Sequence, residues 1–246
     1  MLIIATGVVC FLFAAFVFFD LLSLMPRLSG SHLKMNGLGF SFQTIINTIK
    51  RIFLVLIPPS VGVIALNGTV SDVFYAIYLA HAATIASFTL AYVLRDVFFR
   101  YFCKMIVQYS QGESLRKSAI LAIRREHSIS GLAQIKFNRE NVRFELLPVI
   151  VWIFFFYASS GFIINIIASV LPEYSVIVLQ MTGFFNALGT MALAFYLDPK
   201  ISRIYESGRD VKSVYVTLFV GQMINILIAS PIFYGSMAAL SIFLGQ

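Results

Sequence analysis

Six long apolar runs constrain this chain more than any other feature of its sequence. An α-helix needs about 18 residues or more to cross the hydrocarbon core of a bilayer. Runs of that length cover residues 2–19, 38–66, 73–94, 146–170, 176–197 and 214–244. Backbone polar groups in lipid must be bonded within their own segment, so these runs predict helices. We expect an all-α, polytopic membrane protein with six transmembrane helices in a single transmembrane domain, residues 1–246.

Composition supports this class, because 59% of the residues are hydrophobic, 12% are charged and the mean hydropathy is +0.89. No ordinary soluble domain has this balance. The first run has no basic residues before it and ends at Asp20, where a cleaved signal peptide would have small residues. We therefore expect it to be retained as the first helix. Cys10 and Cys103 lie at different depths and offer no disulfide framework.

The basic residues are gathered in three connections, which predicts the orientation of the chain. The net charge is +7, and ten of the 18 Lys and Arg residues lie between Arg95 and Arg143. Others lie between the first and second runs and between the fifth and sixth, whereas the remaining connections and both termini have none. By the positive-inside rule the basic connections are cytoplasmic and both termini are outside. This distribution, without any recognisable nucleic-acid-binding motif, argues against nucleic acid as a partner.

The basic connection in the middle divides the chain into two groups of three helices. We expect residues 1–101 to form the first three-helix half, 102–143 a basic cytoplasmic or interfacial segment, and 144–246 the second half. Three is odd, so the halves would have opposite orientations, as in inverted-repeat transporters. Residues 114–137 alternate basic and apolar side chains at helical spacing, which predicts an amphipathic helix on anionic lipids. The alternative is a solvated linker.

A polar face within the second run predicts a ligand site. Gln43, Asn47 and Lys50 share one side of a helix, with Arg51 at its edge. An ionisable residue at membrane depth is costly and normally faces a bundle interior or a hydrated cavity. The alternative is an interfacial amphipathic helix that keeps the basic pair at the head groups. Residues 52–66 would then be short for a span, which favours the buried interpretation.

Prolines and glycines predict the ends of the first two helices. Pro26 should stop or kink the first helix before Arg27, and Gly30 and Gly37 should bracket a short loop. The adjacent prolines at 58 and 59 should interrupt the long second helix. Asp20 and Arg27 have two interpretations that the sequence does not separate: an interfacial ion pair that ends a span, or direct contact with a ligand.

The remaining polar residues are sparse. His81, in the third run, is more typical of a hydrogen-bonded packing residue than of a proton relay. Asp198, Pro199 and Lys200 close the fifth helix at the basic side. Six other residues should mostly provide hydrogen bonds between helices: Asn165, Gln180, Asn186, Thr190, Gln222 and Asn225.

The sequence contains no motif for catalysis or for a bound cofactor. It has no Walker A loop, no HExxH, no cysteine and histidine spacing for a metal and no nucleophile with an evident base. We expect no cofactor and no metal, and transport rather than an enzymatic reaction. A membrane enzyme acting on polyprenyl phosphates, a non-catalytic scaffold of a glycan-assembly complex and a small-solute exporter remain alternatives.

Short motifs in the chain resemble the Amj-type lipid II flippases. The resemblance rests on Asp20, on Arg27-Leu28-Ser29-Gly30, on Asn47 and Arg51 in the polar helix, and on Asp198-Pro199-Lys200. It implies export of an undecaprenyl-pyrophosphate-linked saccharide across a bacterial cytoplasmic membrane. Glycan-synthesis proteins are candidate partners, in addition to the anionic lipids expected at the basic segment and a second copy of a chain with only six helices. On this interpretation the residues that bind the substrate are Arg27, Lys50, Arg51, Asn47 and Gln43. Coupling or gating is expected of Asp20, His81 and Asp198.

Overall fold

The computed structural model describes residues 1–124, 137–208 and 210–243. Throughout these residues the regular secondary structure is helical, without strands. Six helical segments are long and apolar enough to cross a membrane, which confirms the predicted fold class. Residues 125–136, part of the predicted amphipathic segment, lie outside the described residues, as does the predicted end of the sixth run at 244.

The elements of the first half, with the short helices after it, are α1 (Leu2–Leu22), α2 (Leu24–His32), α3 (Asn36–Asn67), α4 (Val70–Ser110), α5 (Leu115–Arg124) and the 3₁₀ turn η1 (Arg139–Asn141). Those of the second half are α6 (Leu147–Val170), η2 (Pro172–Tyr174), α7 (Ser175–Gln180), α8 (Thr182–Ala192), the π-helix η3 (Leu193–Leu197), α9 (Asp198–Ser207), α10 (Val211–Ile224), the π-helix η4 (Asn225–Ala229) and α11 (Ser230–Phe243). The continuous segment Pro172–Ser207, from η2 to α9, is called the fifth span below.

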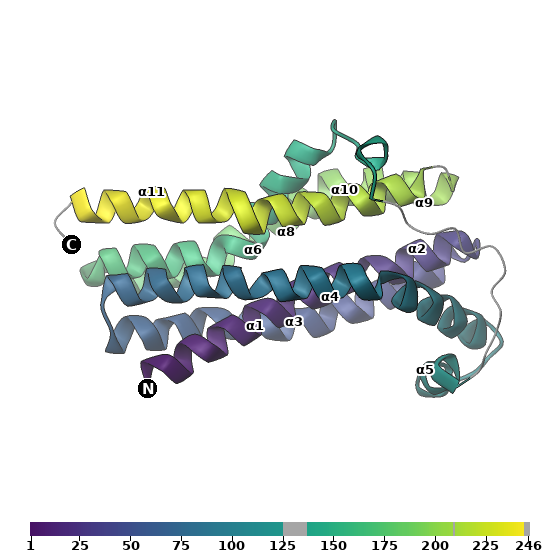
Figure 1. Ribbon diagram of the computed structural model, residues 1–246, viewed down its shortest axis with the longest axis horizontal. Helices are drawn as coiled ribbons and strands as arrows, with labels where there is room; N and C mark the ends of the chain where they lie inside the picture. Colours follow the sequence, from purple (N-terminus) through teal and green to yellow (C-terminus); the bar gives the residue numbers. More distant parts are fainter. Residues whose placement is uncertain (125–136, 209, 244–246) are drawn as a thin grey trace.

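The helices form one elongated bundle with distinct ends (Figure 1). The start of α1 and the end of α11 at Phe243 lie at one end, together with the short turns after α3 and α6. The opposite end, called the basic end below, holds α2, α5 and α9 and the connections that carry most Lys and Arg residues. The first span thus starts, and the last span ends, at the same end of the bundle, as expected for six crossings. The basic residues gather at the other end, as predicted.

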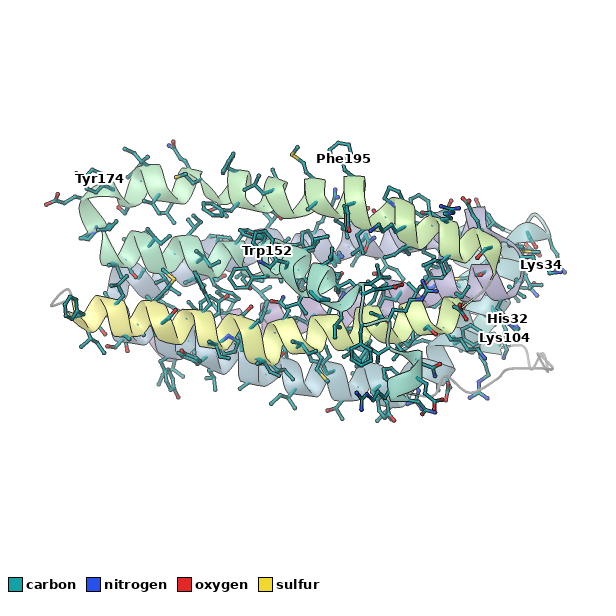
Figure 2. The ribbon with its side chains drawn as sticks, turned by 90° about the horizontal axis from the view of Figure 1, so that it is seen from above. His32, Lys34, Lys104, Trp152, Tyr174 and Phe195 are labelled. Carbon is teal, nitrogen blue, oxygen red and sulfur yellow. The ribbon has the colours of Figure 1, made fainter. Side chains whose placement is uncertain are left out.

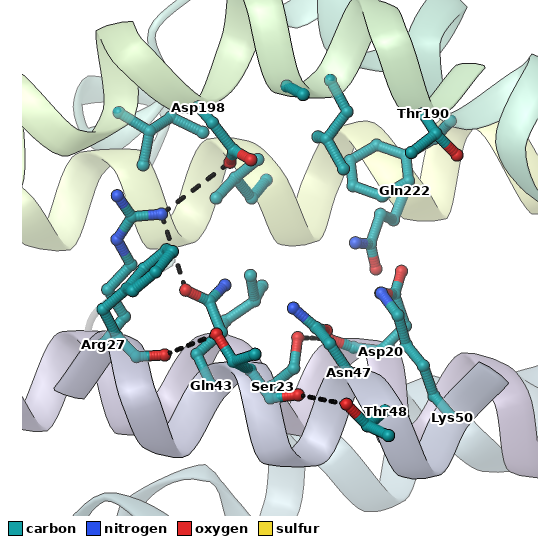
Figure 3. Close-up of a pocket in the computed structure, with 18 of the residues that line it drawn as sticks. Asp20, Ser23, Arg27, Gln43, Asn47, Thr48, Lys50, Thr190, Asp198 and Gln222 are labelled. Atoms are coloured by element: carbon teal, nitrogen blue, oxygen red, sulfur yellow. Dashed lines mark hydrogen bonds and ion pairs between the residues drawn. The ribbon is translucent and has the colours of Figure 1, made fainter. Parts of the chain in front are cut away.

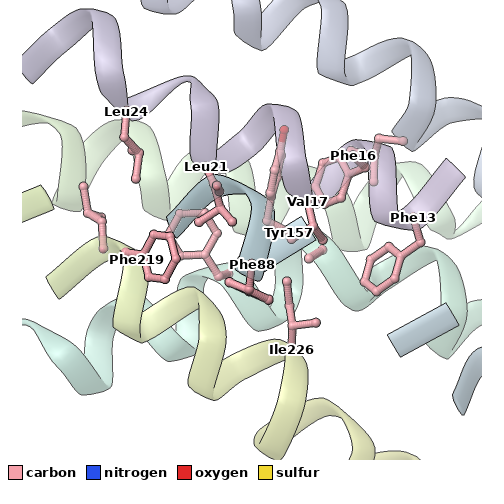
Figure 4. Close-up of a cluster of buried hydrophobic side chains, with 14 of the residues drawn as sticks. Phe13, Phe16, Val17, Leu21, Leu24, Phe88, Tyr157, Phe219 and Ile226 are labelled. Atoms are coloured by element: carbon pink, nitrogen blue, oxygen red, sulfur yellow. The ribbon is translucent and has the colours of Figure 1, made fainter. Parts of the chain in front are cut away.

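Helix α1 belongs to the first half and also contacts the second half through buried aromatic side chains. It packs chiefly on α3 and α4. Aromatic pairs then join the halves: the Phe13 and Phe162 ring centroids are 4.8 Å apart. Those of Phe16 and Tyr157, both labelled in Figure 4, are 6.0 Å apart. Edge-to-face and tilted arrangements of this kind add stability beyond burial alone.

A close approach of two backbones forms the connection between α2 and α3. The first helix is interrupted at Ser23, just before Pro26, which lies in the first turn of α2, so the predicted stop or kink before Arg27 is confirmed. Gly30 lies in α2, Gly37 in α3, and the loop is residues 33–35. A Cβ atom on Gly30 would lie 2.6 Å from the Gly39 Cα, which is closer than side chains tolerate. Glycine at position 30 is therefore required by contact between the helices and not by a loop conformation.

Helix α3 runs through Pro58 and Pro59 without interruption, so the predicted break is wrong. The two prolines have no N–H groups, and the carbonyls of Leu54 and Val55 therefore lose their usual donors. Such losses are tolerated in membrane helices where neighbours supply packing. Here α6 supplies it, because Gly161 leaves room for the Pro58 ring, whose Cγ is 3.1 Å from the position of a Cβ on Gly161.

The third span is much longer than its apolar run. Helix α4 continues through Arg95 and Arg100 to Ser110, so residues 102–110 belong to it and not to a separate segment. Phe102, Cys103 and Ile106 are buried there by the packing of α4 against its neighbours. Helix α5 begins at Leu115, packs back on α4 and leaves Ile123 exposed. This confirms helical structure in the first part of the amphipathic segment.

The contact between Gly30 and Gly39 predicts a specific loss of stability. Gly30→Ala should lower the free energy of unfolding by about 1–3 kcal/mol, because the added methyl group forces α2 and α3 apart. Gly37→Ala is the matched control, since nothing lies within 4 Å of a Cβ at that position. Thermal unfolding of the purified proteins in detergent measures the difference. Equal melting temperatures for the two variants would contradict the proposed close contact.

Candidate functional site

A polar cavity of about 260 Å³ lies between the two halves, toward the basic end (Figure 3). Its walls come from the end of α1, from α2, from the first half of α3, and from α6, the fifth span and α10. The residues that line it are Asp20, Ser23, Leu24, Arg27, Phe40, Gln43, Thr44, Asn47, Thr48, Lys50, Arg51, Phe154, Thr190, Leu193, Ala194, Asp198, Ile201, Tyr205, Leu218 and Gln222. Seven of the eight predicted site residues are therefore brought together, and His81 is not.

A buried ion pair joins α1 to α3 at the inner wall. The Lys50 Nζ donates to Asp20 Oδ1, and both residues are only 5% exposed. The ammonium also lies 5.1 Å from the centre of the Tyr157 ring on α6, where a cation is attracted to the face of the ring. The charge of Lys50 is thus compensated by the protein itself, so that Lys50 is not a free cation available to an anionic ligand.

The ion pair lies near mid-depth in the bundle. Lys50 is about 21 Å along α3 from its start at Asn36, near the middle of this 32-residue helix. Its contact with Tyr157 gives a second measure, because Tyr157 is near the middle of the 24-residue α6. The bundle therefore buries Lys50, as the sequence favoured, in contrast to the interfacial alternative.

Arg27 joins three elements across the basic end of the cavity. One guanidinium nitrogen lies 3.8 Å from Asp198 Oδ1 on α9 and 3.5 Å from Gln43 Oε1 on α3 (Figure 3). The other donates to the Ser202 hydroxyl. Its planar group also lies over the Tyr205 ring, 4.8 Å from the centroid. Arg27 thus links the first half to the second.

The ion pair between Asp20 and Arg27, one of the two interpretations left open by the sequence, is not formed. Asp20 pairs with Lys50, and Arg27 pairs with Asp198. The two residues are seven positions apart along nearly continuous helices, so Arg27 lies about 10 Å closer to the basic end. The partners that are close in space come from elsewhere in the chain.

Arg51 differs from the other two cations of the cavity. It lines the cavity but is exposed at the outer surface of the bundle. It makes no ion pair or hydrogen bond with any of the described residues. Counting the ionisable lysine, arginine and aspartate side chains of the wall gives three cations and two anions, hence a net charge of +1, to which Arg51 contributes the uncompensated charge.

Uncharged amides and hydroxyls complete the wall. Gln222 is 1% exposed, yet neither its amide nitrogen nor its oxygen has a partner among the described residues. The Asn47 Oδ1 atom is likewise buried and unpartnered within this part of the structure. An unpaired buried amide is costly, so both groups are suited to bond a ligand or water in the cavity. Gln222 and Thr190 were expected to hold helices together, and their place in the cavity was missed.

One signal could have found Gln222. It shares a helix face with Asn225, as Gln43 and Asn47 share a face of α3. The two polar faces are equally visible in the sequence. Only the face on α3 has charged residues beside it, Lys50 and Arg51, and it alone was therefore predicted as a ligand site. Asn225 accepts a hydrogen bond from Ser230 Oγ at 3.1 Å within its own span, and it is Ser230, 2.7 Å from Ser159 Oγ on α6, that makes the link between helices.

His81 lies away from the cavity, in an aromatic cluster. Its Nδ1 is 2.9 Å from the Ile77 carbonyl oxygen on its own helix, and its ring lies 4.7 Å from that of Phe13 and 5.2 Å from that of Tyr234. These contacts agree with a packing residue. A role in coupling stays a prediction that the cavity geometry does not support.

The cavity offers binding chemistry more readily than metal chemistry. No group of three His, Cys, Asp or Glu side chains capable of holding a metal ion occurs in the described ranges.

Comparisons of the chain with family models, with curated proteins and with solved structures found no match. The resemblance to Amj-type flippases therefore stays a prediction.

The Asp20 and Lys50 pair predicts a large cost for removing either partner alone. Lys50→Met should lower the free energy of unfolding by about 3–5 kcal/mol, because it leaves the Asp20 carboxylate buried without its cation. Adding Asp20→Leu should restore much of the loss. Thermal unfolding in detergent measures both effects.

The exposed Glu113 and Lys117 pair, with oxygen and nitrogen 2.8 Å apart, is the control. Lys117→Met should cost less than about 1 kcal/mol. A Lys50→Met protein as stable as this control would show that the buried pair contributes little.

Proposed function

We propose that this protein is a flippase that moves an undecaprenyl-pyrophosphate-linked saccharide, lipid II or a related glycan precursor, from the inner to the outer leaflet of a bacterial cytoplasmic membrane. The observation that carries the proposal is the polar, net-cationic cavity between the two three-helix halves, which extends from the basic end to the buried ion pair near mid-depth. A cavity at that depth suits a substrate whose polar head group must pass an apolar barrier.

The charges of the cavity suit a pyrophosphate. Guanidinium groups bind phosphate oxygens through two parallel hydrogen bonds, and two arginines, Arg27 and Arg51, line the wall. Arg27 is held by Asp198, whose side chain is 42% exposed, so this ion pair is accessible to a competing phosphate. Arg51 does not have to leave a carboxylate in order to bind a phosphate, because no described residue compensates its charge.

The uncharged part of the wall suits a saccharide. Sugar hydroxyls both donate and accept hydrogen bonds, and amide side chains can satisfy both functions. Gln222 and Asn47 supply buried amide atoms without protein partners among the described residues, and Gln43 lies beside them. Binding of hydroxyl groups would remove the cost of leaving these atoms unpaired.

The size of the cavity indicates that substrate passage requires a conformational change. Its volume of about 260 Å³ is below the roughly 300–1,000 Å³ of typical small-molecule sites. It can hold a pyrophosphate but not a whole lipid-linked oligosaccharide. On this proposal, breaking the Arg27 contacts to Asp198 and Ser202 opens the basic end, and the cavity alternates between the two sides.

Transport in this direction needs no ATP. Moving a negative charge outward across an inside-negative membrane is favourable by about 2.3 kcal/mol per charge per 100 mV. The sequence has no Walker A loop that would bind a nucleotide. On this proposal the driving force is the membrane potential acting on the pyrophosphate, or exchange of the substrate with protons.

Complementation tests the proposal. The chain should restore growth to a bacterium depleted of its own lipid II flippases, and Arg27→Gln should reduce transport about tenfold or more, because a charged hydrogen bond to phosphate is lost. Arg203→Gln is the matched control, since Arg203 is an exposed arginine on α9 that does not line the cavity. Expression and membrane insertion are measured for each variant.

Failure of a correctly inserted parent protein to restore growth would exclude lipid II as an efficient substrate. Fluorescent undecaprenyl-pyrophosphate-linked saccharides in proteoliposomes then test the wider class. Absence of transport for these as well would overturn the proposed function.

A further inference from the structure

The cavity has one side that helix packing does not close. Helix α3 packs on α1, α2, α4 and α6, and the fifth span packs chiefly on α6. Residues of α3 and of the fifth span line the cavity, yet the two segments do not pack closely on each other. Figure 2 shows the fifth span, from Tyr174 past Phe195, along the edge of the bundle. Exposed residues of both segments line the cavity, among them Thr48, Arg51 and Ala194, so the cavity opens to the outer surface between α3 and the fifth span, and this opening is called the slot below.

Polar residues follow the α3 edge of this slot. Thr44, Thr48 and Arg51 succeed one another at helical spacing, line the cavity and are exposed. The two threonine hydroxyls donate to carbonyls one turn back, Thr44 to Phe40 at 3.0 Å and Thr48 to Thr44 at 2.9 Å. Their oxygen lone pairs remain free to accept hydrogen bonds.

An apolar row lies directly beside the polar one. Ile45, Ile49 and Ile52 are also exposed on α3 but do not line the cavity. These side chains suit lipid tails. Helix α3 therefore has an apolar face of isoleucines beside a polar face of threonines and an arginine, and the polar face lines the slot.

Contacts of neighbouring helices lie beyond both ends of the part of α3 that lines the slot. At the basic end, Arg27 donates to Ser202 and lies beside Asp198, while Ser31 Oγ donates to the Tyr205 carbonyl at 3.1 Å. At the other end, α3 closes on α6 where Pro58 meets Gly161. The open length lies between these contacts, at the level of Thr48 and Arg51.

Arg51 indicates what enters. An arginine exposed near the middle of a membrane-spanning helix is costly unless its charge is compensated. No described residue supplies the compensation. A ligand that brings an anion from the surrounding lipid would supply it, and the planar guanidinium suits phosphate oxygens.

We propose that the slot between α3 and the fifth span is a lateral entrance through which the phosphate-bearing head group of a membrane lipid enters the cavity while its chain stays in the bilayer. Arg51 is the first phosphate contact, and Thr44 and Thr48 accept hydrogen bonds from the head group. The inference rests on the proposed function, for which it names the route of entry and the recognised group.

Photo-crosslinking tests the entrance in the full chain. A benzophenone amino acid is placed at Thr48, or at Ile49 as the adjacent control on the apolar row, and the protein is reconstituted in phosphatidylcholine vesicles. Undecaprenyl phosphate or phosphatidylglycerol is then added as the probe. We expect Thr48 to label undecaprenyl phosphate several-fold more than Ile49 does. Arg51→Gln should reduce that labelling about tenfold, the loss of one charged hydrogen bond.

The two probes separate the sources of the phosphate. Preference of Thr48 for undecaprenyl phosphate assigns the entrance to polyprenyl lipids, and equal, Arg51-dependent labelling by phosphatidylglycerol assigns it to lipid phosphates generally. Both outcomes support the entrance. Equal labelling at Thr48 and Ile49, or labelling unaffected by Arg51→Gln, would overturn it. A probe at Thr44 repeats the test if the Thr48 variant does not fold, as judged by gel filtration.

The entrance and the proposed function fail in distinguishable ways. If the parent protein transports lipid-linked saccharide but Thr48 is not selectively labelled, the entrance is wrong and the function stands. If labelling is selective but no transport occurs, the chain binds lipid phosphates without moving them.

Discussion

The buried ion pair between Asp20 and Lys50 is the interaction on which the arrangement of this bundle depends. Neither charge is tolerable in lipid alone, so the two must meet where helices cover them on every side. This requirement fixes the rotation of α1 and α3 against each other. Because Gln43 and Asn47 share a face with Lys50, the same rotation directs their amides toward the space that becomes the cavity.

The two halves are joined by different kinds of contact at the two ends of the bundle. Toward the termini, aromatic rings such as Phe13 and Phe162 pack the halves together, and no polar exchange can loosen them. Toward the basic end, Arg27 joins the halves through hydrogen bonds and an ion pair, which water or an anion can replace. This difference favours motion at the basic end about a fixed apolar part, the pattern expected of a hinged bundle.

The six helices and the polar face of α3 could be predicted from the sequence because both depend on local periodicity. The pairing of charges could not, since Arg27 and Asp198 are far apart in the chain and meet through the fold alone. The first helix is interrupted before Pro26 as expected, whereas α3 continues through the prolines at 58 and 59 because its packing on α6 outweighs their local cost. Gln222 was visible as a polar residue, yet its lack of partners depends on the helices around it. Arg51 and Lys50 looked equivalent, and a rotation of 100° separates an exposed cation from a buried one.

The prolines of α3 have a mechanical consequence. The loss of two successive backbone bonds at Pro58 and Pro59 makes this the place where α3 bends most easily. Beyond it the helix is anchored to α6, whereas the part before it forms the wall of the cavity. A few degrees of bending at the prolines would therefore be magnified along the roughly 30 Å of helix that precedes them. The width of the cavity can then change by several ångströms while the aromatic packing of the core stays as it is.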